Sequence, residues 1–295
     1  MFTIENLKFG YKRSRLLYDN LSFSLRPGRI CGLLGENGVG KSTLLYLICG
    51  ALHPLGGSVR FRGYESFCRR PDQLSHLFLL PEEFDVPDLK LHSYLALYAP
   101  FYPRFSYEQM RANLAGFDLG GEDWRLGTLS MGQRKKVLIS FALATNTELL
   151  LMDEPTNGLD IPGKSVFRRL IAQNMSDERS LLVSTHQVAD IGRMLDEVFI
   201  LDTQGVRLDA TVEEVCRALR FEFNADSDEA EAPDVLYRQP SPGGYGLVLP
   251  NETGEESRFD LELLFNSVRK NPAVVECIRK KQTDKNENDN KEENE

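Results

Sequence analysis

The chain has 295 residues, of which 41% are hydrophobic and 27% are charged, and its formal net charge is −9. This length suffices for one large domain and a small one, whereas the acidic balance argues against a nucleic-acid partner, because phosphate backbones are bound by clustered lysine and arginine. No run approaches the roughly 20 apolar residues that span a bilayer, and the N-terminal residues do not resemble a secretory signal.

The N-terminal part of the chain predicts strands that lead into a helix. Apolar and polar residues alternate over residues 3–7 and 21–25, which is typical of strands, with residues 11–20 as their connection. Residues 29–34 are a mainly apolar run, as expected of a buried parallel strand. Residues 41–49 then have helical character.

The middle of the chain predicts an α/β fold with a helical insertion. From residue 87 to residue 124, Tyr, Phe, Leu and Ala recur at helical spacing, interrupted by Pro100 and Pro103. Helices and strands alternate beyond this insertion, which predicts a mainly parallel sheet covered on both faces. We expect helices at residues 130–144, 164–174, 188–195 and 211–219, and strands at 148–153, 180–184 and 198–202.

The composition shifts after residue 220. Residues 226–233 are acidic and predict a linker, and residues 235–237 and 245–249 are expected to pair as strands. With a helix at 260–269, they form a small C-terminal βα appendix. We therefore predict three parts: a main domain over 1–220, with its helical insertion at about 87–125, an accessory region over 221–282, and an acidic tail over 283–295 that we expect to be disordered because it has no apolar residue.

A phosphate-binding loop is predicted between the strand and the helix near residue 40. The eight residues Gly35-Glu36-Asn37-Gly38-Val39-Gly40-Lys41-Ser42 fit the P-loop pattern. Glycines let backbone N–H groups turn toward phosphate oxygens, and the helix dipole adds to the attraction. Lys41 would bring its charge to the β- and γ-phosphates of ATP, and the Ser42 hydroxyl would ligate Mg²⁺.

Two carboxylates end a second apolar run. Residues 149–152 are Leu, Leu, Leu and Met, and Asp153 and Glu154 follow them. Such a strand delivers acids to the edge where α/β sheets bind ligands. Asp153 would hold Mg²⁺ and Glu154 would deprotonate the attacking water. Taken alone, the pair could be an acidic turn, but the P-loop favours the functional interpretation.

A second anion-binding helix start is predicted at Leu129-Ser130-Met131-Gly132-Gln133, just before a long helix. The P-loop already surrounds one side of a nucleotide. The second helix start is therefore expected to serve a nucleotide held by another copy of the chain, which predicts a dimer.

These segments, together with Gly158-Leu159-Asp160 and His186, occur in the order and approximate spacing of ABC-transporter ATP-binding subunits. The resemblance covers residues 1–219. It implies a P-loop NTPase fold whose parallel core sheet is joined by an N-terminal antiparallel β part. It also implies ATP hydrolysis with Mg²⁺.

The resemblance assigns roles to matching residues. Tyr11 lies where an aromatic ring stacks on adenine, although it could also be a strand-edge tyrosine. The segment from Gly35 to Thr43 resembles Walker A. Ser130, Gly132 and Gln133 belong to the signature segment, in which Ser130 and Gly132 would face the γ-phosphate of the opposing subunit. Further matches are Asp153 with the Walker B acid, Glu154 with the catalytic base, Asp160 with the D-loop and His186 with the switch histidine.

One position departs from the family. ABC proteins usually carry glutamine in the loop that leads into the helical insertion, and Glu82 stands at that position here. Its carboxylate is expected to bind Mg²⁺ still, while adding negative charge near the phosphates.

The resemblance implies an ATPase that energises transport through head-to-tail dimerisation. The expected partners are a transmembrane permease subunit, which docks near residues 82–125, and a second copy or a homologous ATPase subunit. No nucleic-acid partner is expected. The chain would then be cytoplasmic and peripheral on the inner face of the cell membrane. The alternative is a soluble ABC-type regulatory ATPase that is not coupled to transport; the direction of transport and the role of the C-terminal region stay open.

Overall fold

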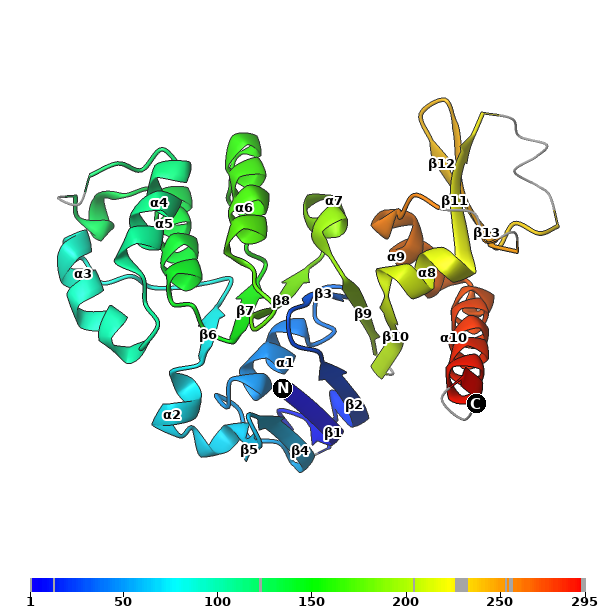
Figure 1. Ribbon diagram of the computed structural model, residues 1–295, viewed down its shortest axis with the longest axis horizontal. Helices are drawn as coiled ribbons and strands as arrows, with labels where there is room; N and C mark the ends of the chain where they lie inside the picture. Colours follow the sequence, from blue (N-terminus) through cyan, green and yellow to red (C-terminus); the bar gives the residue numbers. More distant parts are fainter. Residues whose placement is uncertain are drawn as a thin grey trace.

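The computed structural model describes residues 2–12, 14–121, 124–203, 205–225, 233–252, 254 and 257–292. Its centre is a six-stranded sheet of order β10-β9-β3-β8-β7-β6 (Figure 1). Neighbouring strands are parallel except β10, which runs antiparallel to β9. The predicted mainly parallel core sheet is therefore confirmed. Its strands are β3 (Ile30–Leu34), β6 (Leu77–Leu80), β7 (Leu149–Asp153), β8 (Ser180–Thr185), β9 (Glu197–Asp202) and β10 (Gly205–Thr211).

A four-stranded antiparallel sheet of order β2-β1-β4-β5 forms the N-terminal β part. Helix α1 (Lys41–Ile48) packs between this sheet and the central one, because Leu44 shares a buried cluster with Phe2 of β1 and Leu151 of β7. The strands are β1 (Phe2–Phe9), β2 (Tyr18–Leu25), β4 (Gly56–Phe61) and β5 (Tyr64–Glu65).

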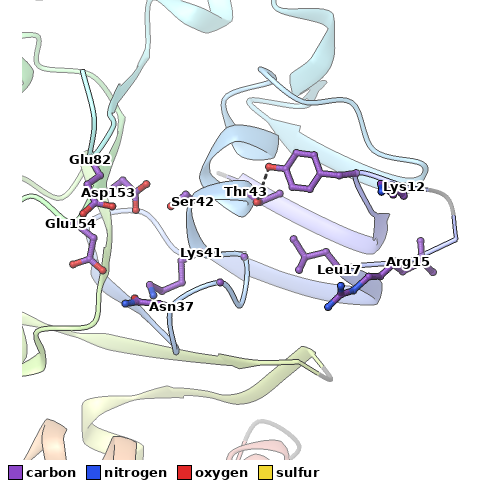
Figure 2. A pocket seen from close by; sticks show the side chains of 14 residues that line it. Lys12, Arg15, Leu17, Asn37, Lys41, Ser42, Thr43, Glu82, Asp153 and Glu154 are labelled. Carbon is purple, nitrogen blue, oxygen red and sulfur yellow. Dashed lines mark hydrogen bonds between the residues drawn. The ribbon is translucent and has the colours of Figure 1, made fainter. Parts of the chain in front are cut away.

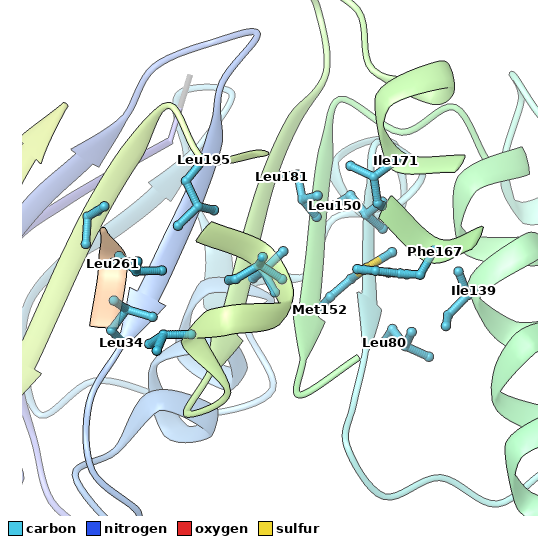
Figure 3. Close-up of a cluster of buried hydrophobic side chains, with 14 of the residues drawn as sticks. Leu34, Leu80, Ile139, Leu150, Met152, Phe167, Ile171, Leu181, Leu195 and Leu261 are labelled. Atoms are coloured by element: carbon cyan, nitrogen blue, oxygen red, sulfur yellow. The ribbon is translucent and has the colours of Figure 1, made fainter. Parts of the chain in front are cut away.

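Helices α5 (Met131–Ala144) and α6 (Ile161–Asn174) cover the opposite face of the central sheet (Figure 3). Side chains along a strand alternate between its two faces. Leu150 and Met152 of β7 accordingly pack with Ile139 and Phe167 of these helices. The alternate residues Leu149 and Leu151 pack on the side of α1. The apolar strand residues 149–152 are thus covered on both faces of the sheet.

The predicted helical insertion lies between β6 and α5. Its elements are α3 (Leu91–Tyr98), η2 (Ala99–Phe101), α4 (Tyr107–Gly116) and η3 (Leu126–Thr128). An aromatic cluster anchors it, since Phe141 of α5 lies within 5.1–6.0 Å, ring centre to ring centre, of four other rings. These rings belong to Phe78, Tyr94, Tyr102 and Phe105. Two short elements, η1 (Ser66–Cys68) and α2 (Pro71–Leu74), precede β6.

The C-terminal part forms the predicted βα appendix. It contains a three-stranded antiparallel sheet of order β11-β13-β12, which packs with two helices. Leu264 and Ile278 of these helices share one buried cluster with Val198 of the central sheet. Besides β9 and β10, the elements that follow β8 are α7 (Val188–Ile191), η4 (Gly192–Met194), α8 (Val212–Ala218), β11 (Leu219–Asn224), β12 (Tyr237–Ser241), β13 (Gly244–Pro250), α9 (Leu261–Lys270) and α10 (Pro272–Glu292).

Several C-terminal details differ from the sequence predictions. The strand expected at 235–237 occupies Tyr237–Ser241 instead, because the turn at Pro242 and Gly243 pairs Ser241 with Gly244. Strands β10 and β11 were not predicted. The helix expected at 188–195 gives way to the 3₁₀ turn η4 after Ile191.

The tail also differs from the expectation. Helix α10 continues to Glu292, although residues 283–295 were expected to be disordered. Its first turns are packed through Val274 and Ile278, and extending an existing helix is far less costly than starting one. Residues 293–295 and most of the predicted linker lie outside the described residues. In the described part of the chain, no helix has both the length and the apolar character to cross a membrane.

Candidate functional site

The segment from Gly35 to Thr43 turns tightly between β3 and α1. Gly40 precedes the first helical residue with φ +113°, a conformation that side chains rarely adopt. A Cβ atom at this position would also collide with the Tyr18 hydroxyl, which donates a 2.5 Å hydrogen bond to the Gly40 carbonyl. Val39 is buried and packs against Gly35, so its side chain supports the loop from below. The loop shape therefore depends on glycine at position 40.

Lys41 is the first residue of α1, and its side chain turns back into this loop. Its buried ammonium group donates to the carbonyl oxygens of Gly35, at 2.8 Å, and Glu36, at 3.2 Å. Burial lowers the pKa of Lys41, while the carboxylates of Glu154 and Asp153 act in the opposite direction. The cation is thus held in the concave side of the loop and faces two acids.

A pocket of about 710 Å³ opens in front of the loop (Figure 2). The Tyr11 hydroxyl lies 3.0 Å from the Thr43 hydroxyl, and most of the Tyr11 side chain is exposed at the pocket rim. The pocket brings together most of the predicted nucleotide and metal residues. Its lining includes Tyr11, Asn37, Gly38, Gly40, Lys41, Ser42, Thr43, Glu82, Asp153 and Glu154. The sequence analysis missed Lys12, Arg15, Leu16 and Leu17, which also line it.

Asp153 and Glu154 stand at the C-terminal end of β7, opposite the P-loop. Both are buried, and Asp153 accepts a hydrogen bond from the Ser184 hydroxyl of β8. Glu154 accepts from the Thr185 hydroxyl at 3.0 Å and from the His186 backbone N–H at 3.0 Å. The end of β8 therefore holds both acids in place.

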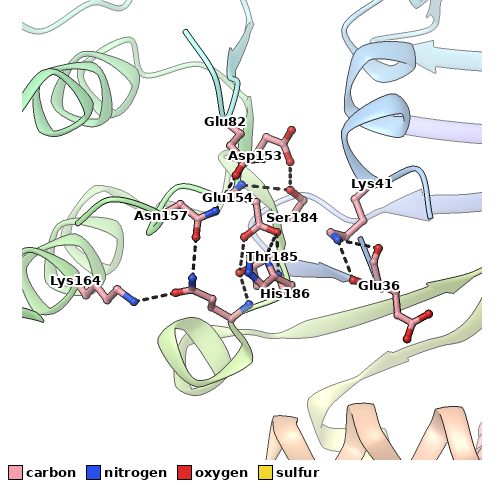
Figure 4. A network of polar contacts seen from close by, with 12 residues as sticks. Glu36, Lys41, Glu82, Asp153, Glu154, Asn157, Lys164, Ser184, Thr185 and His186 are labelled. Atoms are coloured by element: carbon pink, nitrogen blue, oxygen red, sulfur yellow. Dashed lines mark hydrogen bonds and ion pairs between the residues drawn. The ribbon is translucent and has the colours of Figure 1, made fainter. Parts of the chain in front are cut away.

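His186 binds the same carboxylate through its side chain. Its Nδ1 atom lies 2.7 Å from Glu154 Oε1 (Figure 4). A carboxylate has about four lone-pair sites, and three hydrogen bonds to Glu154 are formed by Thr185 and His186. One site is left with which the carboxylate can accept a hydrogen bond from water.

Glu82 joins the site from the loop after β6. Its Oε1 accepts from the Asn157 amide at 2.8 Å, and Asn157 Oδ1 accepts from the Gln187 amide at 2.9 Å. Gln187 in turn accepts from Lys164 at 2.8 Å, and Lys164 forms an ion pair with Asp190 at 2.7 Å. Figure 4 shows the contacts that lead from Glu82 through Asn157 to Lys164. The sequence analysis missed Asn157, Gln187 and Lys164, since each has an ordinary polar identity and its role depends on distant partners.

The signature segment lies away from this pocket. Ser130 is the N-cap of α5: its hydroxyl accepts from the Gln133 N–H at 3.2 Å, and the Gln133 side chain accepts from the Ser130 N–H at 3.0 Å. Gly132 packs against Gly158, because a Cβ atom on Gly132 would lie 2.9 Å from the Gly158 carbonyl oxygen. Ser130, Gly132 and Gln133 are not brought to the nucleotide pocket of their own chain.

Asp160 lies beside the signature segment. Lys136 of α5 binds it at 2.9 Å and holds the pKa of the Asp160 carboxyl below its usual value. The neighbouring Ile161 is 85% exposed and Met131 of the signature segment is 63% exposed. Two exposed apolar side chains thus lie beside the segment that was predicted to face the nucleotide of an opposing subunit.

The oxygen donors of the pocket suit Mg²⁺ bound together with a nucleotide. In the part of the chain that the structure describes, no cluster of three or more His, Cys, Asp or Glu side chains could hold a metal by itself. Mg²⁺ typically takes one or two carboxylates together with phosphate oxygens and water. The Ser42 hydroxyl and the carboxylates of Asp153 and Glu82 all line the pocket, so the oxygen donors fit a metal that is shared with a nucleotide.

Comparisons with known proteins agree with this geometry. The family model described as ABC transporter matches residues 18–157. The cytochrome c biogenesis ATP-binding export protein CcmA of Reclinomonas americana is 30% identical, over 68% of this chain and 90% of that protein. A solved ATP-binding subunit of an ABC transporter superposes with TM-score 0.67 and 25% identity, over 74% of this chain and 92% of its own. A dimeric ATP-binding cassette bound to ADP and Pi shares the fold, with TM-score 0.62 and 24% identity, over 72% of this chain and 98% of its own.

The order of the motifs, the arrangement of the pocket and the extent of these matches lead to one conclusion. The chain belongs to the family of ABC transporter ATP-binding proteins, and it is an ATPase.

Proposed function

We propose that this chain hydrolyses ATP between two of its copies and thereby drives a separate transmembrane partner. The observation that carries the proposal is the position of Ser130. It caps α5 outside the pocket that contains Lys41, Asp153 and Glu154. Because the signature segment does not line the pocket of its own chain, we expect it to contact a nucleotide held by a second copy.

Within one copy, each site residue has a proposed task. Backbone N–H groups of the P-loop would hold the phosphates, and Lys41 would exchange the carbonyls of Gly35 and Glu36 for phosphate oxygens. Tyr11 would stack on adenine. Ser42, Asp153 and Glu82 would hold Mg²⁺, which neutralises phosphate charge when bound. The side chains named here all line the same pocket, namely Tyr11, Lys41, Ser42, Glu82 and Asp153.

Hydrolysis needs a positioned water more than covalent chemistry by the protein. Glu154 is proposed to orient and deprotonate that water through its remaining lone-pair site. His186 is fixed on Glu154 at 2.7 Å and is proposed to contact the γ-phosphate from there. The segment 184–186, at the end of β8, would thus contact both the γ-phosphate and the proposed catalytic base.

The opposing copy would complete the site with Ser130 and Gly132, and Asp160 would connect the two sites. The dimeric cassette with which this chain shares its fold supports the association, as do the exposed Met131 and Ile161. Loss of the γ-phosphate on hydrolysis would remove the group that both copies share, and the dimer would open. That opening would move the transmembrane partner, through which the chain is bound to the inner face of the membrane.

Replacing the base tests the catalytic part of the proposal. Glu154→Gln is expected to bind ATP like the unmodified chain and to hydrolyse it about 10²- to 10⁴-fold more slowly, because the amide cannot accept the proton. Lys41→Ala, in contrast, is expected to lose both ATP binding and hydrolysis. Fluorescent-nucleotide titration and phosphate release measure the two properties separately. Wild-type turnover by Glu154→Gln would refute the assignment of the base.

A further inference from the structure

A buried lysine contacts the catalytic glutamate from below. Lys135 of α5 is only 3% exposed, and its ammonium group donates a 2.7 Å hydrogen bond to the backbone carbonyl of Glu154. Burial lowers the pKa of Lys135, whereas the surrounding carboxylates of Glu82, Glu154 and Asp153 favour its charged form. A lysine is rarely buried unless its ammonium group is paired, and here its partner is a backbone carbonyl.

The backbone of Glu154 has an unusual conformation. Its φ is +44°, in the left-handed region that a residue with a side chain seldom adopts. Such a conformation persists only where its surroundings enforce it. The Glu154 N–H donates to the Ser184 carbonyl at 3.0 Å, and its carbonyl accepts from the Asn157 N–H at 3.2 Å and from Lys135 at the shorter 2.7 Å.

We propose that Lys135 is a positioning residue for Glu154 and connects it to the signature segment; the inference rests on the proposed role of Glu154 as the base. Lys135 holds the left-handed turn that aims the carboxylate at Thr185 and His186. It lies five residues after Ser130 in the same helix, about 7.5 Å along its axis. One rigid helix therefore links the segment that meets the nucleotide of the second copy to the base of its own site.

The test compares variants that keep or remove the donor. Lys135→Met removes the ammonium group at similar length, Lys135→Arg retains charge and donors, and Arg111→Met makes the same kind of change at an exposed position of α4. Lys135→Met is expected to lower kcat about 10- to 100-fold while the KM for ATP stays within about threefold. Lys135→Arg is expected to recover most of the loss, and Arg111→Met to behave like the unmodified chain.

A double variant separates positioning from general support of the fold. If Lys135 acts through Glu154, adding Lys135→Met to Glu154→Gln will not slow single-turnover hydrolysis further. A further loss in the double variant, an unchanged kcat in Lys135→Met, or an equal loss of ATP binding and kcat would overturn the inference. If Lys135→Met does not fold, as judged by thermal unfolding, Lys135→Gln is measured against the same criteria.

The inference and the proposed function fail in different ways. Wild-type turnover by Glu154→Gln removes the base assignment, whatever Lys135 does. An inactive Glu154→Gln together with a fully active Lys135→Met removes only the role of Lys135.

Discussion

Single residues decide how closely the segments of the site approach one another. Gly132 is the clearest case, because its α-carbon faces the carbonyl of Gly158, which precedes the D-loop residue Asp160. A Cβ atom there would lie 2.9 Å from that oxygen, so any side chain must push the two segments apart. Helix α5 and the loop before α6 can remain in contact only if position 132 has no side chain.

The substitution Gly132→Ala tests this contact. Alanine favours helix formation by about 1 kcal/mol over glycine, so the melting temperature is expected to stay within a few degrees of the unmodified value. Hydrolysis is expected to fall about tenfold or more, because displacing a positioned group by a fraction of an ångström is costly to catalysis. Gly120→Ala is the control, since no atom lies within 4 Å of its added Cβ. Equal ATPase rates in both variants would contradict the account.

Site residues within contiguous motifs could be predicted from the sequence, and those that act across the fold could not. Lys41 and Asp153 each belong to a local sequence motif, and both line the same pocket. Lys135 and Asn157 owe their positions to contacts with residues that are 19 and 75 positions away in the chain. A lysine in an amphipathic helix gives no sign that it will be buried. Its partner becomes visible only once α5 is packed against the end of β7.

At the scale of elements, the helical insertion presents apolar side chains to solvent. Phe101 of η2 is 66% exposed, and Leu97 of α3 and Tyr107 of α4 are also exposed. The aromatic cluster around Phe141 packs the inner side of the insertion, and neither Phe101 nor Leu97 belongs to it. Exposed apolar groups on one element favour a protein partner, which supports the proposed docking near residues 82–125.

Phe101→Asp is therefore expected to separate hydrolysis from coupling. The isolated chain should hydrolyse ATP at its normal rate, because Phe101 does not line the pocket. Its co-purification with a membrane protein in detergent should be lost, since a carboxylate would be buried at the interface. Phe223→Asp, on the 60% exposed Phe223 of β11, is the matched control. Loss of the membrane partner in both variants, or in neither, would argue against docking through the insertion.

Elements with strong periodicity were predicted well, and those stabilised by pairing were not. Helices α5 and α6 and strand β7 have the expected positions to within a few residues. Strand β10 buries only Leu208 and Ala210 and exists because it pairs with β9. Strand β11 likewise depends on β13, and their pairing begins at Leu219, the residue at which the predicted helix was expected to end.

At the scale of the whole molecule, the C-terminal part reaches the nucleotide site. Arg269 of α9 forms an ion pair with Glu36, which lies within the P-loop. Leu261, at the start of the same helix, packs against Gly192, which follows His186 by six residues. The C-terminal part therefore contacts the P-loop and the segment after His186, and it is not a separate appendage.

The association of two copies also depends on a property of the whole molecule, its net charge. Each copy carries a formal charge of −9, so approach is opposed at long range, although salt screens this repulsion beyond about 8 Å. A triphosphate adds negative charge to the interface, which lysines and bound metal are expected to neutralise. Contacts from both copies to the γ-phosphate would then favour association. The dimer is therefore expected to form with ATP and to dissociate when the γ-phosphate is lost.

Sedimentation velocity of the Glu154→Gln variant, with ATP and with ADP, measures this dependence on the γ-phosphate. The variant is expected to be a dimer with ATP and a monomer with ADP. Adding Ser130→Arg to Glu154→Gln should give a monomer that still binds ATP, because only the contribution of the second copy is blocked. A monomer in ATP without the Ser130 change, or a dimer that persists with it, would contradict the claim that two copies clamp each triphosphate.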